Sequence, residues 1–360
     1  MSKTLKYIRI GVLILNCIGI LMLWMSCAST WLHPASFPRL ALLGLLFPVF
    51  MCINLAFIPL WLVVNYRRAW IPLAALLPIA MYILDYCPIS IEHDVPKKAI
   101  KVLSWNTSHF GGNYEDKEEG KRLTIDYIIN SDADIICLQE SVGGGEVIDS
   151  FYTEMEKRGY KRDSYRSTQL LSRFDILDLD SIDYETQGDD NGAKGNGSKW
   201  YRLKVDGREL VLVNNHLESN HLVDSIKQKY VSNLDNPEYD GMKESGRAIG
   251  RNLTSSTSRR GGQADSLACF AQRHEGEYIV MCGDFNDTPI SYTYQRVNRE
   301  LKSAFRQSGK GIGLSYNKRG FWVRIDHLFM SSNISSYNTY IDNTITTSDH
   351  YPLVSWLDFE

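Results

Sequence analysis

Long uncharged apolar runs dominate the first quarter of the chain, and shorter apolar runs alternate with polar stretches over the rest. Residues 10–32 and 40–64 contain no charged side chain. A helix needs about 20 residues to cross the hydrocarbon core of a bilayer, and each run meets that length. Trp31, Trp61 and Tyr66 lie near the ends of these runs, as aromatic side chains do at membrane interfaces. The pattern predicts two membrane-spanning helices.

A third apolar run, over about 69–86, is shorter and contains Pro72 and Pro78. It either crosses a thin bilayer or lies in the interface. Basic side chains favour the cytoplasmic ends of spanning helices, so three spans place everything after residue 90 on the non-cytoplasmic side, whereas two leave it in the cytoplasm. We predict an anchor of two to three spans over residues 1–92, with the following domain on the non-cytoplasmic side. The basic residues behind this topology are Lys3, Lys6, Arg9, Arg67 and Arg68.

After a linker at 93–98, residues 99–360 have the length and periodicity of one large α/β domain. Asp206 and Gly207 separate two apolar runs and favour a hairpin between them. Two glycine-rich stretches, 186–198 and 241–262, are expected to be irregular. Strands are predicted at 100–105, 135–138, 199–205, 210–214, 278–281 and 324–330, and helices at 117–130, 147–157 and 263–273.

Polar side chains follow several of the predicted strands at the point where each strand ends. Sites in α/β sheets form at the carboxyl ends of strands. A single Asp or Asn in such a place is more often a turn or capping residue, but their recurrence favours a shared site. These residues are Asn106, Glu140, His216, Asp284 and Asn286, with Asp326 in a later apolar run and Asp349 and His350 near the C-terminus.

Six short motifs in a fixed order carry a resemblance to a known family. They are WN (105–106), LQE (138–140), NNHLES (214–219), GDFND (283–287), RIDHLF (324–329) and SDHYPLV (348–354). Residues 99–360 resemble the endonuclease/exonuclease/phosphatase superfamily, the DNase I-like fold, and especially its membrane-anchored bacterial members. The resemblance implies an α/β (α+β) four-layer sandwich with two mixed sheets face to face. It also implies a divalent-metal site in a cleft. The apolar runs lie outside the resemblance, and they predict a multi-pass protein, which for a bacterial member would lie in the inner membrane.

The resemblance assigns a metal site and part of the catalytic machinery. Asn106, Glu140 and Asp349 are the expected ligands of Mg²⁺ or Mn²⁺, which prefer oxygen donors. Asp284 is expected to orient or deprotonate the attacking water, and Asn286 to donate to the phosphate. The ions and polar groups would neutralise charge on the phosphoryl oxygens.

The two histidines of the site are expected to share the acid and base work, because imidazole titrates near neutral pH. The resemblance places His350 on the phosphate with its ring held by Asp326, and His216 on the leaving oxygen. How these roles are divided with Asp284 stays open. His327 follows Asp326 in a strand, so its side chain should point to the opposite face.

The Ser172-Arg173 step resembles a family motif on the substrate side of the cleft, so Arg173 is a candidate substrate-binding residue. An ordinary surface arginine at a strand end is the alternative. The seven cysteines show no CxxC spacing, and we predict neither a zinc site nor a disulfide framework.

The balance of basic and acidic side chains bears mainly on which substrate the domain binds. The chain has 39 basic and 42 acidic side chains, of which residues 1–92 hold six and two, so the remaining domain is acidic. Nucleases that follow many phosphates use Lys and Arg, and the domain has no basic run. We predict a membrane-anchored phosphoesterase acting on phosphodiesters, endonuclease-type by family default.

Two alternatives stay open. One is a phospholipid or phosphoinositide phosphodiesterase or phosphatase at the membrane. The other is a non-catalytic membrane scaffold or binding module, which the joint presence of Glu140, Asp284, Asp349 and His350 disfavours. The expected partners are a phosphate-ester substrate, either nucleic acid or a lipid head group, and the lipid bilayer; no protein partner is predicted.

Overall fold

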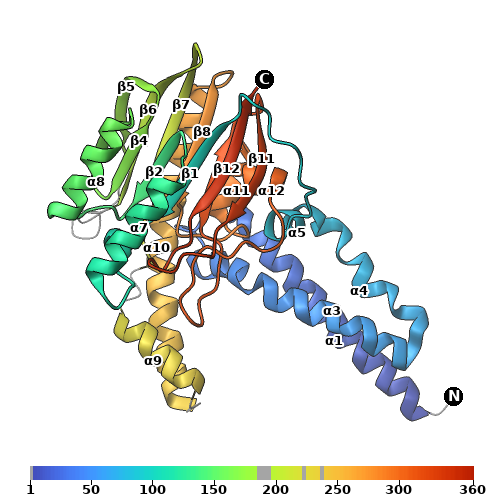
Figure 1. The fold of residues 1–360 in the computed structure, drawn as a ribbon. Coiled ribbons are helices and arrows are strands. Elements are labelled where there is room, and N and C mark those ends of the chain that lie inside the picture. Colours follow the sequence, from blue (N-terminus) through green and yellow to red (C-terminus); the bar gives the residue numbers. More distant parts are fainter. Residues whose placement is uncertain (1–2, 185–195, 221–223, 236–238) are drawn as a thin grey trace.

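Two six-stranded sheets lie face to face with helices outside them, and the N-terminal helices project from one end (Figure 1). The computed structural model describes residues 3–184, 196–220, 224–235 and 239–360. The four-layer sandwich is the predicted fold. Most of the predicted 186–198 loop lies outside the described residues.

The first sheet has the order β11-β12-β1-β2-β4-β3. Strands β1 and β2 are parallel, and every other neighbouring pair in this sheet is antiparallel. The strands are β1 (Ile100–Asn106), β2 (Ile135–Gln139), β3 (Lys161–Tyr165), β4 (Thr168–Ser172), β11 (Ile334–Ile341) and β12 (Leu353–Phe359).

The second sheet has the order β5-β6-β7-β8-β10-β9. Strands β7 and β8 are parallel, so both sheets are mixed and each places two strand ends at one edge. The strands are β5 (Asp175–Ile182), β6 (Gly197–Val205), β7 (Arg208–His216), β8 (Tyr278–Asp284), β9 (Lys302–Ser303) and β10 (Asp326–Met330).

The predicted hairpin between β6 and β7 is confirmed. Val205 pairs with Arg208, and the two residues between them have φ values of 48° for Asp206 and 84° for Gly207. Two consecutive positive φ angles form the turn whose twist matches antiparallel strands.

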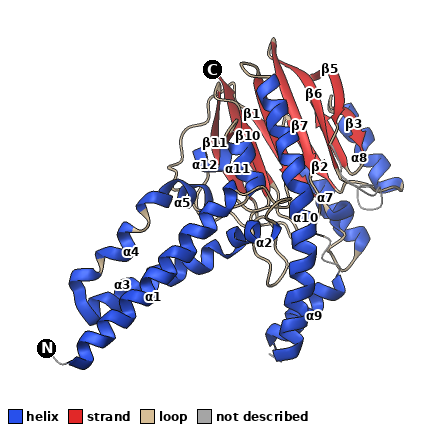
Figure 2. Cartoon of the chain, turned by 180° about the vertical axis from the view of Figure 1, so that it is seen from behind, coloured by secondary structure: helices blue, strands red, loops and turns tan. Residues whose placement is uncertain are grey.

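Three apolar layers hold the sandwich together. Val102 and Leu212 belong to the layer between the sheets, Ile128 to the layer under the helices of the first sheet, and Phe270 to that of the second. Figure 2 shows α10 crossing the second sheet and continuing beyond its edge beside α9. The domain helices are α6 (Ser108–Gly111), α7 (Lys117–Asn130), α8 (Glu146–Lys157), α9 (Asp224–Asp235), α10 (Tyr239–Arg273), α11 (Tyr292–Asn298) and α12 (Ala304–Ser308).

Helix α10 corrects the prediction that residues 241–262 are irregular, because the helix runs through them without a break. Arg260, 1% exposed, donates from Nη1 to the Glu218 carbonyl oxygen at 2.8 Å and from Nε to Asp287 at 3.4 Å. Such tertiary contacts outweigh the low helix propensity of glycine.

The N-terminal region forms long apolar helices that lie side by side (Figure 1). The helical segments Lys3–Trp31 and Pro38–Arg68 are long and apolar enough to cross a membrane, and Trp70–Tyr86 is shorter. After Tyr86 the chain runs along the domain, where Ile89 forms a bridge with Lys310, before β1 begins. The segments are α1 (Lys3–Ala28), η1 (Ser29–Trp31), α2 (Pro38–Ala41), η2 (Leu42–Leu46), α3 (Phe47–Asn65), η3 (Tyr66–Arg68), α4 (Trp70–Ala74), η4 (Leu77–Ile79) and α5 (Ala80–Tyr86).

Candidate active site

The ends of β1, β2 and β8 meet through the side chain of Asn106, the last residue of β1. Its Nδ2 donates to Glu140 Oε1 at 3.2 Å and to Asp284 Oδ2 at 3.0 Å. Its Oδ1 accepts from the backbone N–H of Ser108 at 3.1 Å. One amide therefore joins carboxylates from the two sheets.

Gly283 allows the close strand approach that positions Asp284. Its φ is +133°, and a Cβ placed there would lie 2.0 Å from the carbonyl oxygen of Asn215 in β7. No side chain fits in that space, so only glycine lets β7 and β8 come this close. Asp284 Oδ1 then accepts from the backbone N–H of Asn286 at 2.8 Å, which fixes the carboxylate.

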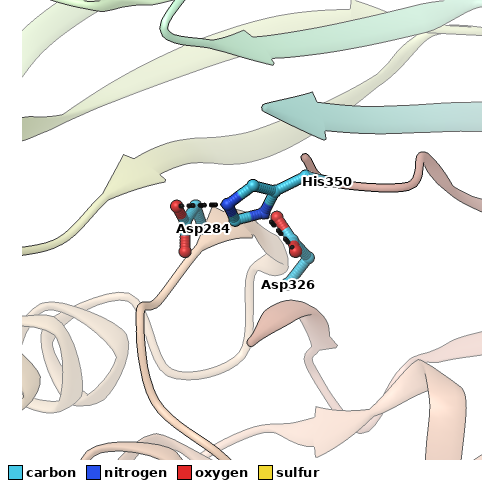
Figure 3. Close-up of side chains that lie close together, drawn as sticks. All are labelled: Asp284, Asp326 and His350. Carbon is cyan, nitrogen blue, oxygen red and sulfur yellow. Dashed lines mark hydrogen bonds and ion pairs between the residues drawn. The ribbon is translucent and has the colours of Figure 1, made fainter. Parts of the chain in front are cut away.

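His350 is held between two carboxylates (Figure 3). Its Nδ1 lies 2.8 Å from Asp326 Oδ2, and its Nε2 lies 3.8 Å from Asp284 Oδ2. The two carboxylates are neighbours because Asp326 pairs with Asp284 across β10 and β8. Since a carboxylate accepts, Nδ1 carries a proton and Nε2 faces Asp284.

A second histidine, His216 at the end of β7, lies beside the carboxylates of Asp284 and Glu140. Its Nδ1 lies 2.8 Å from Ser167 Oγ, while its Nε2 lies 3.7 Å from Glu140 Oε1 and 3.8 Å from Asp284 Oδ2. This buried Nε2 has no hydrogen-bond partner among the described residues. The pattern of strand ends missed Ser167 because it precedes β4, which begins at this edge.

The surroundings of His350, Asp284 and Glu140 shift their pKa values in different directions. Burial lowers the pKa of His350, but the charges of Asp326 and Asp284 outweigh it and raise that pKa to about 10. Burial raises the pKa of Asp284 above its ordinary value. Burial also opposes ionisation of Glu140, yet His216 and His350 hold the pKa of Glu140 below its ordinary value. Carboxylates with pKa values pushed apart suit different roles in acid–base chemistry.

The donor atoms fit a hard divalent cation. Ligand atoms of Asp284, Asp326 and His350 all lie within 4.8 Å of one another, but Asp326 Oδ2 is already engaged by His350. Glu140 is only half-buried and offers an anionic oxygen beside Asp284, which suits Mg²⁺ or Mn²⁺. Asn106 turns its N–H groups to the carboxylates, so its oxygen reaches a cation there only if the amide rotates.

Of the remaining residues, Asn286 and Asp349 lie at the site, whereas His327 faces away from it. Asn286 is buried beside Asp284 and donates from Nδ2 to the Leu217 carbonyl oxygen at 3.2 Å. Asp349 is half-buried, and its charge contributes to the raised pKa of His350. The prediction for His327 is confirmed: it lies on the other face and contacts the Asp287 carbonyl oxygen at 2.8 Å, and burial lowers its pKa to about 3.

Arg173 corrects the prediction of a substrate-binding residue. It follows the end of β4, which runs antiparallel to β2, so it lies at the opposite edge of the sheet from Glu140. There its guanidinium pairs with Asp132 and, at 3.0 Å, with Asp134. These contacts give Arg173 a structural role away from the site.

Comparisons with known proteins agree with this geometry. The model of the endonuclease/exonuclease/phosphatase family matches residues 103–350, and a domain of unknown function (DUF8431) matches residues 8–86. No curated protein sequence matches the chain.

Solved structures share the fold at low sequence identity. The catalytic domain of human Nocturnin with bound sulfate has a TM-score of 0.53 and 17% identity, covering 74% of this chain and 97% of that one. A humanized D. rerio TDP2 has a TM-score of 0.51 and 15% identity, covering 73% and 100%. Truncated Caenorhabditis elegans TDP2 has a TM-score of 0.50 and 17% identity, covering 74% and 100%.

The matched segment covers more than half of the chain and contains the strand ends that carry the candidate site. Members of the matched family are typically hydrolases of phosphoester bonds and generally use divalent metals. The chain belongs to the endonuclease/exonuclease/phosphatase family.

Proposed function

We propose that the protein is a membrane-anchored hydrolase of phosphodiester bonds that depends on Mg²⁺ or Mn²⁺. The observation that carries this proposal is the arrangement of His350 and His216 around Asp284, with both Nε2 atoms 3.8 Å from the same carboxylate oxygen. Two imidazoles and a buried carboxylate supply the proton donors and acceptors that phosphoester hydrolysis requires.

Glu140 is the residue that would hold the cation, with Asn106 and Asp349 beside it. When bound, the cation neutralises charge on the phosphoryl oxygens and lowers the pKa of a coordinated water. Glu140 is suited to this because its lowered pKa keeps it ionised.

The chain's own residues divide the proton transfers. Asp284 orients the attacking water and accepts its proton, for which a pKa raised above the ordinary value of an aspartate is favourable. His350 remains protonated at neutral pH and donates from Nε2 to a phosphoryl oxygen. His216 directs its Nε2 into the same space and delivers a proton to the leaving oxygen.

Asn286 completes the phosphate contacts. One N–H of its amide is used on the Leu217 carbonyl oxygen. An asparagine amide has two such donors, so the second is available for a phosphate oxygen.

The N-terminal helices support the membrane anchor. Their apolar side chains are largely exposed, as they are in helices that face lipid. Lys3 begins α1, and Arg67 and Arg68 end η3, which follows α3. The start of α1 and the connection from α3 to α4 lie far from the catalytic domain (Figure 1). The segment α4 to α5 then returns to the domain, so three passes put it on the non-cytoplasmic side of a bacterial inner membrane.

A lipid substrate is the second candidate beside nucleic acid. Ile290, in the loop after Asp284, packs with Leu23 and Phe47 of the apolar helices. The catalytic loop is thus in direct contact with the anchor, which would hold the site close to the bilayer surface. This contact favours a phosphodiester in a lipid head group, whereas the endonuclease reading rests on the family default.

The test uses the full chain purified in non-ionic detergent. Plasmid DNA, RNA, phospholipids and phosphoinositides are each incubated with Mg²⁺, with Mn²⁺ and with EDTA. We expect hydrolysis of one class that EDTA abolishes and added metal restores. Nicked plasmid alone would support the nuclease, and released head group alone the lipid hydrolase. Hydrolysis of none of the four classes with either metal would refute the proposed function.

A further inference from the structure

A cavity of about 930 Å³ lies between helix α10 and the turn that joins the two long apolar helices. The turn contributes Arg39 and Leu42, and α10 contributes Lys243, Arg247 and Arg251. The cavity is separate from the candidate active site. Arg260, which reaches the catalytic loop, lies nine residues further along α10, about 13 Å at the helical rise.

The charged residues of this basic cavity converge from both walls. Lys243, Arg247 and Arg251 recur every fourth residue, so they share one face of α10. Arg39 lines the cavity from the opposite wall. The positive side chains of Arg39, Arg247 and Arg251 repel one another across the cavity, which favours an anion between them.

Among the described residues, the lining of the cavity holds little compensating negative charge. Glu244, the one acidic residue recorded in the lining, is paired with Lys229 at 2.8 Å. Arg39, Arg247 and Arg251 are exposed residues. Within the described part of the chain, no ion pair or hydrogen bond is recorded for these three. The cavity is therefore a positively charged site with unused donors.

The position of the cavity points to the membrane surface. Arg39 lies in α2, the short helix that leads through η2 into α3, and α1 and α3 leave the catalytic domain at this turn (Figure 1). If these helices span a bilayer, as in the proposed function on which this inference rests, the turn lies at the depth of the lipid phosphates. Leu42 adds an apolar contact beside the charges.

We propose that the basic cavity binds the anionic phosphate head group of a membrane lipid. Phosphate oxygens accept from several guanidinium groups at once, and three guanidinium groups around one open cavity match a compact anion. An extended nucleic acid would instead need a continuous basic track. This site would hold anionic lipid beside the catalytic domain.

The test measures lipid binding by the full chain in non-ionic detergent with EDTA present, so that hydrolysis does not interfere. The probes are short-chain phosphatidylglycerol, short-chain phosphatidylcholine and inorganic phosphate. The variant Arg39→Gln/Arg247→Gln/Arg251→Gln is compared with Arg122→Gln/Lys157→Gln/Arg273→Gln, which removes the same charge from exposed positions on α7, α8 and the end of α10.

We expect the wild type and the control variant to bind phosphatidylglycerol more tightly than either other probe. Each basic residue near an anionic lipid contributes roughly fivefold in affinity, so the cavity variant should lose on the order of 100-fold. The conservative variant Arg39→Lys/Arg247→Lys/Arg251→Lys should retain most of the affinity, because its charges are kept.

Three results would overturn the inference: unchanged binding by the cavity variant, equal binding of phosphatidylcholine, or inorganic phosphate binding as tightly as phosphatidylglycerol. Thermal unfolding of each variant, followed by tryptophan fluorescence, confirms that it is folded. Hydrolysis of a soluble phosphodiester by the same preparations separates the two proposals. If the phosphoesterase proposal alone fails, lipid binding persists without metal-dependent hydrolysis.

Discussion

Asp326 Oδ2 lies 2.8 Å from Nδ1 of His350, although the two residues are 24 positions apart. The contact forms because Asp326 begins β10 beside Asp284 and His350 lies in the segment that leads into β12. It fixes the imidazole so that Nε2 faces Asp284. It also keeps His350 positively charged near neutral pH, since the pKa of His350 is raised to about 10.

Replacement of Asp326 should change how stability depends on pH. The pKa of His350 is raised from 6.5 to about 10, so its stabilising contribution is complete below pH 6.5 and is lost as pH rises through 10. We expect Asp326→Asn to lose about 1.5–3 kcal/mol at pH 6, with the difference from wild type shrinking towards pH 10. Thermal unfolding in EDTA across this range measures it.

The control for that experiment is Asp349→Asn. Asp349 also acts on the charge of His350, but its half-buried carboxylate makes no recorded hydrogen bond to the ring within the described residues. Its replacement should cost less stability than that of Asp326. An Asp326→Asn variant as stable as wild type at pH 6 would show that the pair is not charged as we infer.

Ser167→Ala should slow catalysis without unfolding the domain. The variant removes the hydroxyl 2.8 Å from Nδ1 of His216, so the ring loses the partner that orients it. We expect kcat to fall about tenfold to 100-fold with little change in KM. Ser150→Ala, an exposed serine on α8, is the matched control.

Steady-state kinetics of the double variant Ser167→Ala/His216→Ala tests whether the serine acts through the histidine. The double variant should be no slower than His216→Ala alone, because the two residues act as a unit. Additive losses would contradict the positioning role.

The sequence predicted the parts of the structure that depend on neighbouring residues or on polar side chains directly after buried strands. The hairpin at Asp206 and Gly207 is local. The cluster of Asn106, Glu140 and Asp284 follows because their strands end at one edge.

The failures have a common physical cause, which is long-range packing. The family motif at Ser172-Arg173 predicts a substrate contact but does not reveal that β4 runs antiparallel to β2, which places Arg173 at the opposite edge from Glu140. Ser167 precedes its strand, so a search of strand ends does not find it. The glycine-rich half of α10 looked irregular, but Arg260 contacts Glu218 and Asp287, which are distant in sequence.

Gly283→Ala should damage both stability and activity. The added Cβ would approach the Asn215 carbonyl oxygen to 2.0 Å at a φ of +133°. We expect a loss of about 3 kcal/mol or more, from overpacking and an unfavourable backbone conformation. Thermal unfolding measures the loss. Gly144→Ala is the control, because nothing lies within 4 Å of its added Cβ and its φ is ordinary. Equal melting of the two variants would contradict the close approach of β7 and β8.

Asp85→Ala should weaken the attachment of the N-terminal region to the catalytic domain. Asp85 is 2% exposed and accepts from Gln295 Nε2 at 2.8 Å and Arg306 Nη1 at 2.9 Å. Its removal leaves both donors without this acceptor, which should cost about 2–3 kcal/mol. The readouts are thermal unfolding and protease cleavage of residues 87–99.

The exposed Asp94→Ala is the control for cleavage in that segment. The double variant Asp85→Ala/Arg306→Gln should lose less than the sum of the single losses, because the partners interact directly. Unchanged protease resistance and melting in Asp85→Ala would argue against this attachment.

The most direct test of the catalytic site is turnover of bis(p-nitrophenyl) phosphate, a soluble phosphodiester, by the full chain with Mg²⁺ or Mn²⁺. Asp284→Asn and His350→Gln keep the side-chain size but remove the proposed base and the charged donor, whereas Asp126→Asn changes an exposed carboxylate on α7. We predict that kcat falls about 10²- to 10⁴-fold in the first two variants while the control keeps wild-type, EDTA-sensitive turnover. Wild-type turnover in Asp284→Asn or His350→Gln would contradict the assignment of the site.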